Sequence, residues 1–99
     1  MPKGIMIVES RPASPEEAEA YHRWYEDVHI PELLGVDGFV SARRLTVDEG
    51  DSFVAVYEVD DVEQARSALA SAQGSGTMTR PAGMQLDPPP SVRWLSDLG

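Results

Sequence analysis

The order of the apolar segments constrains the fold of this chain more than any other feature. Four short runs rich in β-branched and aromatic residues alternate with two segments of helical spacing, in the order strand, helix, strand, strand, helix, strand. This is the split βαβ (βαββαβ) pattern of an α+β protein. Since 99 residues have room for one hydrophobic core, we predict a single domain over residues 1–99.

The predicted strands cover residues 4–9, 38–47, 52–59 and 92–95. The first is almost continuously apolar, which is typical of a central strand buried on both faces. The second and third are separated by a turn at residues 48–51, so we expect a hairpin. Residues 74–90 contain three glycines and four prolines, which predicts a long loop that serves as a lid or a dimer arm.

Both helices carry start signals. Ser14, Pro15 and Glu17 form a capping box, in which the Ser14 hydroxyl accepts a hydrogen bond from the Glu17 amide. Pro31 places the end of this helix near residue 30, with one further turn to residue 34 as the alternative. The second helix is capped by residue 60 or 61, ends near residue 72, and carries one apolar stripe. The stripe consists of Val62, Ala65, Leu69 and Ala72.

Composition excludes several classes of partner and site. The net charge of -9 disfavours nucleic acid and anionic membranes as partners. The absence of cysteine excludes disulfides and thiolate sites. The longest wholly apolar run, residues 5–8, is too short to span a membrane, and the N-terminus lacks a signal peptide pattern, so we expect a cytoplasmic protein. A core this small gains stability from a second subunit on an exposed sheet face, which favours a homodimer.

The first helix holds the candidate chemistry. At about 100° per residue, Ala18, His22, Tyr25 and His29 share a stripe roughly 60° wide. Polar rings in such a stripe indicate a cleft that side chains do not fill. The structural alternatives are that His22 lies at the solvent edge and that His29 bonds a backbone carbonyl near the helix end.

Metal and cofactor sites are not expected. The two histidines lie about 10 Å apart along the helix axis, too far to bind one metal ion together. The sequence contains no phosphate loop, nucleophile elbow or dinucleotide fingerprint. A haem stays open as an alternative because one histidine suffices as its axial ligand.

A local motif resembles a known family. Trp24, Tyr25, His29 and Pro31 form the helix end W-Y-x-x-x-H-x-P, and the segment 38–44 (GFVSARR) follows it. This pattern resembles the EthD-like branch of the dimeric α+β barrel superfamily. The resemblance implies a ferredoxin-like monomer whose four-stranded antiparallel sheet meets its twin to close a barrel, with no cofactor in many members.

The resemblance also suggests a function. It implies a small aromatic or polyketide-derived ligand in an apolar cavity, with His29 moving a proton next to a carbonyl. Tyr25 is the second catalytic candidate, as a donor to a developing enolate. Candidate substrate contacts are His22, Trp24, Tyr57 and Arg43. Arg43 and Arg44 point to opposite faces of their strand, so one could hold a carboxylate or phenolate, the alternative being surface ion pairing.

The resemblance, together with these residues, leaves three functions open. The first is a cofactor-independent isomerase, cyclase or lyase that uses His29 as general acid and base. The second is a non-catalytic dimeric protein that binds a small hydrophobic molecule. The third is a cofactor-free monooxygenase. The reaction is not determined by the fold, since one fold hosts many activities.

Overall fold

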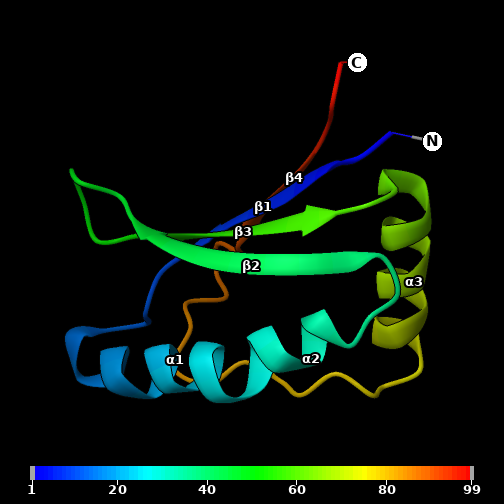
Figure 1. Ribbon diagram of the computed structural model, residues 1–99. Coiled ribbons are helices and arrows are strands. Elements are labelled where there is room, and N and C mark those ends of the chain that lie inside the picture. Colours follow the sequence, from blue (N-terminus) through cyan, green and yellow to red (C-terminus); the bar gives the residue numbers. More distant parts are fainter. Residues whose placement is uncertain (1, 99) are drawn as a thin grey trace.

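The computed structural model describes residues 2–98 and contains one four-stranded antiparallel sheet (Figure 1). The strand order is β2-β3-β1-β4, so β1 and β3 are central. The strands are β1 (Gly4–Ser10), β2 (Phe39–Thr46), β3 (Phe53–Val59) and β4 (Ser91–Ser96). Element order and pairing confirm the predicted α+β ferredoxin-like fold, and β2 and β3 form the expected hairpin.

The first helical segment is longer and less regular than a single α-helix. It is built from η1 (Pro15–Glu17), α1 (Ala18–Trp24), η2 (Tyr25–His29) and α2 (Ile30–Leu34). The extension to Leu34 agrees with the longer of the two predicted ends. Pro31 is tolerated because it lies in the first turn of α2, where the missing N–H is not required. The π-helical segment η2 was not predicted.

The predicted capping box is wrong. The Ser14 side chain makes no capping hydrogen bond. Instead, the Glu17 amide donates to the Ser14 backbone carbonyl at 3.1 Å. The first turn, η1, is a 3₁₀ turn. Its i→i+3 backbone hydrogen bond uses the Glu17 amide, which the Ser14 hydroxyl was expected to bind.

The helices cover only one face of the sheet. In Figure 1, α1 and α2 run beneath the sheet, and α3 (Val62–Gly74) stands at the end where α2 finishes. The prediction that β1 is buried on both faces is therefore wrong for the single chain. The residues of the open face, which are partly exposed, include Ile5, Ile7, Val54 and Val56.

The second helix and the long loop follow the prediction closely. The Asp61 carboxylate accepts a hydrogen bond from the Gln64 amide at 3.0 Å, and the stripe residues Val62, Ala65 and Leu69 are buried. Residues 75–90 form a loop whose one bridge pairs Met84 with Pro12. The Ala13 amide donates to the Gly83 carbonyl at 2.8 Å, and Met84 is buried in the core. The loop thus packs against the start of the helical segment.

Candidate functional site

The π-helical turn aligns two side chains that an α-helix would separate. Within η2 the Ile30 amide donates to the Tyr25 carbonyl, an i→i+5 bond. Trp24 and His29 are five residues apart, which corresponds to about 140° around an α-helix. Here their rings stack, with centroids 4.3 Å apart and planes at 18°. Such π-helical turns occur frequently at functional sites.

Tyrosines complete the surroundings of His29. The Tyr25 ring lies at right angles to the imidazole, with centroids 5.4 Å apart. From β3, Tyr57 approaches the imidazole edge at 6.4 Å between centroids. Both tyrosines are buried, and His29 is partly buried. The helix and the sheet therefore bring together Trp24, Tyr25, His29 and Tyr57, all of which the sequence analysis had selected.

Arg44 is the cation of this site. Its guanidinium carbon lies 4.3 Å from the centre of the Tyr25 ring. Within residues 2–98 no carboxylate forms an ion pair with it, and its Nε and Nη2 atoms are buried without a hydrogen-bond partner. Arg44 as a whole is partly buried, and each buried N–H without a partner is unfavourable unless a water or a ligand accepts its hydrogen bond. We call the group Trp24, Tyr25, His29, Arg44 and Tyr57 the helix–sheet site.

A β-bulge explains why Arg44, and not Arg43, reaches the site. Phe39 pairs with Val59 and Ser41 with Glu58, so one extra residue, Val40, is inserted into β2. Because Phe39 is buried, regular alternation would also turn Arg43 inward. The bulge reverses the alternation, and Arg43 is exposed on the open face of the sheet. Arg43 is thus not brought to the helix–sheet site.

A cluster of hydroxyl groups holds the Tyr25 ring beneath Arg44. The Ser10 hydroxyl lies 2.7 Å from the Tyr21 hydroxyl and 3.1 Å from that of Tyr25. All three residues are buried. Ser10 and Tyr21 were not among the predicted site residues. A polar residue at the end of an apolar strand was the one signal for Ser10, and it is a weak one.

Several buried polar atoms of the site have no partner within residues 2–98. They are Trp24 Nε1, His29 Nδ1, Arg44 Nε and Nη2, and Tyr57 Oη. Buried polar groups are normally paired with protein or with ordered water, so a group of orphans at one place is open to a water or a ligand as partner. The indole and guanidinium atoms can only donate, and the phenol can donate. The site is therefore suited to a ligand that presents acceptor oxygens.

Burial sets the protonation states in the site. Desolvation lowers the pKa of His29 to about 4, against a smaller opposing effect of Glu32. His29 is consequently neutral at pH 7, and the same desolvation makes it a weaker base than a free imidazole. Burial raises the pKa of Tyr57, so its hydroxyl keeps its proton. The Tyr25 pKa is also raised by burial, while the Ser10 hydrogen bond acts in the opposite direction.

His22 lies outside the helix–sheet site. Its ring meets Phe53 edge-on, with centroids 4.6 Å apart, and both residues border a separate cavity. Burial lowers the pKa of His22, and the positive charge of Arg44 lowers it further. The two histidines thus face the sheet at different points along the helix. Phe53 was not among the predicted site residues.

Residues 2–98 contain no group of three or more histidine or acidic side chains that could share a metal ion. Over the same range no helix has both the length and the apolar character needed to cross a bilayer. His29 is the one imidazole of the helix–sheet site.

Comparison with known proteins bears on the fold. No family model matches the sequence, and neither does any curated protein. The structure is similar to the crystal structure of a monooxygenase from the gene ActVA-Orf6 of Streptomyces coelicolor in complex with the ligand nanaomycin D. The TM-score is 0.67 at 15% sequence identity, over 99% of this chain and 89% of the other. At this identity the likeness shows the α+β ferredoxin-like fold alone.

Proposed function

We propose that this protein is a cofactor-independent enzyme that removes a proton next to a carbonyl of a small aromatic or polyketide-derived compound. The observation that carries the proposal is the group of unpartnered buried atoms around a neutral imidazole. A ligand oxygen would satisfy the donors of Trp24 and Arg44, which leaves His29 as the base. The proposal covers isomerases, cyclases and lyases, since all three begin with this step.

The residues divide the chemistry between them. The neutral imidazole of His29 accepts the proton from the carbon next to the carbonyl. The electron pair of the broken C–H bond forms the C=C bond of an enolate, and the π pair of the carbonyl group moves to its oxygen, which takes the negative charge. Arg44 and Trp24 donate to that oxygen, and Tyr57 is a third donor. Charge stabilisation by fixed donors at a buried site is often the largest contribution to catalysis.

Hydrogen exchange on a simple ketone tests the proton transfer without knowledge of the natural substrate. In D₂O, the wild-type protein should accelerate deuterium incorporation at C1 of 2-tetralone, followed by ¹H NMR. His29→Ala should lose at least about 100-fold of this rate, the usual contribution of a positioned base. Asp27→Ala is the matched control, because Asp27 is an exposed residue of the same π-helical turn. Binding of 2-tetralone without exchange would indicate a non-catalytic binding protein.

A cofactor-free monooxygenase is the second candidate. The similarity of the fold to a monooxygenase structure favours it. The enolate would then react with molecular oxygen instead of taking back a proton. Oxygen uptake with 2-tetralone, in buffer without added metal or flavin, separates this activity from isomerisation. Uptake that depends on His29 supports the monooxygenase, while exchange without uptake supports the first candidate.

We further propose that the protein is a homodimer joined through the open face of the sheet. The aliphatic residues of that face stay partly exposed in the single chain. An exposed apolar face is typical of an interaction surface. Membership of the EthD-like branch is likewise a proposal, supported by the W-Y-x-x-x-H-x-P segment that ends at Pro31.

A further inference from the structure

We propose that the cavity lined by His22 and Phe53 receives the apolar end of an elongated ligand whose oxygen is bound by Arg44. This inference rests on the proposed function and extends it, because it gives the ligand a shape. The ligand class is a phenol or enol with an alkyl chain or a further ring along its long axis.

The cavity has a size and a lining that suit such a group. Its volume is about 380 Å³, within the range of about 300 to 1,000 Å³ common for small-molecule sites. Its apolar walls include Pro12, Pro15, Ala18 and Phe53. We call it the hairpin cavity, because it lies where the β2–β3 hairpin meets the start of α1.

The hairpin cavity adjoins the helix–sheet site. Phe53 lines the cavity, and the guanidinium carbon of Arg44 lies 5.8 Å from the centre of the same ring. His22 closes the wall, with its ring edge against Phe53. Arg44 therefore lies close to this wall, and His29 lies farther along the helix. When the ligand oxygen binds Arg44, the reacting carbon lies toward His29, and the remainder of the ligand extends toward the hairpin cavity.

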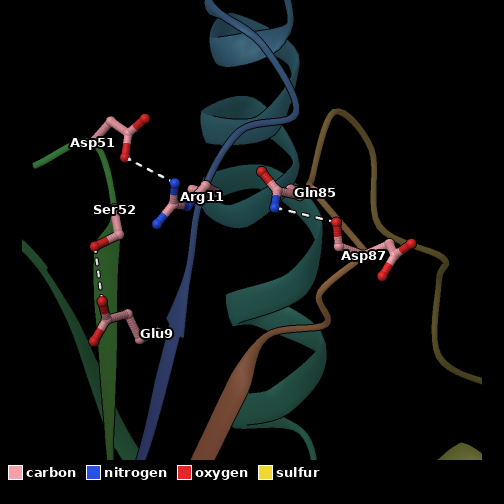
Figure 2. A network of polar contacts seen from close by, with 6 residues as sticks. All are labelled: Glu9, Arg11, Asp51, Ser52, Gln85 and Asp87. Carbon is pink, nitrogen blue, oxygen red and sulfur yellow. Dashed lines mark hydrogen bonds and ion pairs between the residues drawn. The ribbon is translucent and has the colours of Figure 1, made fainter.

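The lining of the hairpin cavity also includes polar residues. Among them, Arg11 forms an ion pair with Asp51 at 3.3 Å, and Gln85 is a third; Figure 2 shows these three side chains. The Arg11 side chain is about half exposed and that of Asp51 more so. Because the lining is mostly apolar, the cavity favours a neutral hydrocarbon group over a second charged group.

Two other cavities fit this role less well. One, of about 160 Å³ beside residues 88–90, is small for a ring. The other, of about 620 Å³, lies between α2 and α3 and includes no residue of the helix–sheet site. The hairpin cavity alone of these three combines adequate volume with a wall that Arg44 also contacts.

A series of 4-alkylphenols, from phenol to 4-hexylphenol, tests the inference by isothermal titration calorimetry. Affinity for the wild type should rise about fourfold with each methylene that enters the cavity. Ala18→Phe fills the cavity, so 4-hexylphenol should lose at least about tenfold in affinity while phenol stays within about twofold. Ala13→Phe fills it from the loop side and gives the same test if the first variant does not fold.

Two controls make the outcome specific. Ala68→Phe places the same ring in the cavity between α2 and α3 and should leave the whole series unchanged. Arg44→Met should weaken every phenol by the same factor without changing the increase per methylene. If Arg44→Met has no effect, the oxygen site of the proposed function is wrong. If the increase is absent in the wild type, or persists in both filled variants, the hairpin cavity is not the binding site.

Discussion

At the scale of single residues, His29 combines two properties that rarely coincide on a surface helix. Its imidazole is stacked on Trp24, and burial keeps it neutral at physiological pH. A neutral imidazole with an unpartnered nitrogen is an available base. Burial of an imidazole disfavours its protonated form. The free energy of unfolding therefore falls when the pH is low enough to protonate the group.

The stability of the protein should therefore depend on pH through His29. Its folded pKa of about 4 lies below the unfolded value of 6.5, so the unfolded chain binds the proton more tightly between these values. The free energy of unfolding should be at its plateau above pH 6.5 and should fall by up to about 3 kcal/mol as pH drops to 4. Urea unfolding of the wild type and of His29→Gln at several pH values measures the contribution of His29 to this decrease. Equal pH dependence of the two proteins would contradict the buried, neutral histidine.

The candidate residues themselves could be found in the sequence, but their roles could not. The density of rings on one helix selected Tyr25 and His29, and the motif W-Y-x-x-x-H-x-P added Trp24. Choosing between Arg43 and Arg44 required the bulge at Val40, which strand alternation does not reveal. The link from Ser10 to Tyr25 joins residues 15 positions apart in sequence and exists only when β1 lies against the helix.

At the scale of elements, the long loop is held to α1 by a close approach at one glycine. A Cβ at Gly83 would lie 2.7 Å from the Glu17 carbonyl oxygen and 2.9 Å from the Tyr21 nitrogen. Its φ of +67° also favours glycine. The next residue, Met84, is in the core, and Gln85 lines the hairpin cavity. The contact thus fixes one wall of that cavity.

Gly83→Ala should accordingly destabilise the protein more than a matched glycine variant. Gly76 has a similar φ of +74°, but no atom lies within 4 Å of the position of its Cβ. Gly76→Ala should lower the free energy of unfolding by about 1 to 2 kcal/mol, which is the cost of placing an alanine in the left-handed backbone conformation. Gly83→Ala should cost at least about 1 kcal/mol more, because backbone atoms must move. Equal losses in thermal or urea unfolding would show that the loop does not rest on α1.

At the scale of the whole molecule, the face of the sheet that no helix covers leaves aliphatic side chains partly exposed. Ile7 of β1 pairs with Val56 of β3 at the centre of that face. The proposed dimer would bury these aliphatic side chains and so add to a core that is small for its surface. The helix–sheet site and the hairpin cavity lie on the other side of the sheet.

A charge at the centre of this face should separate the subunits. Native mass spectrometry of the wild type should give twice the mass of the 10.8 kDa chain. Ile7→Lys should give the single-chain mass with an unchanged circular dichroism spectrum, because the residue is not in the helix-side core. Leu98→Lys alters a fully exposed leucine and should keep the dimer. A wild-type monomer, or a dimer that persists in Ile7→Lys, would overturn this interface.

The sequence by itself determined the element order, the hairpin, a cap at residue 60 or 61 and the helix that carries the candidate chemistry. These features depend on local propensity and on hydrophobic period, which neighbouring residues encode directly. Only the tertiary structure decided that Arg44 faces the helix, that Trp24 stacks on His29 and that Ser10 holds Tyr25. Each of these depends on an irregular element or on a contact across the sheet, and periodic patterns carry no signal for either.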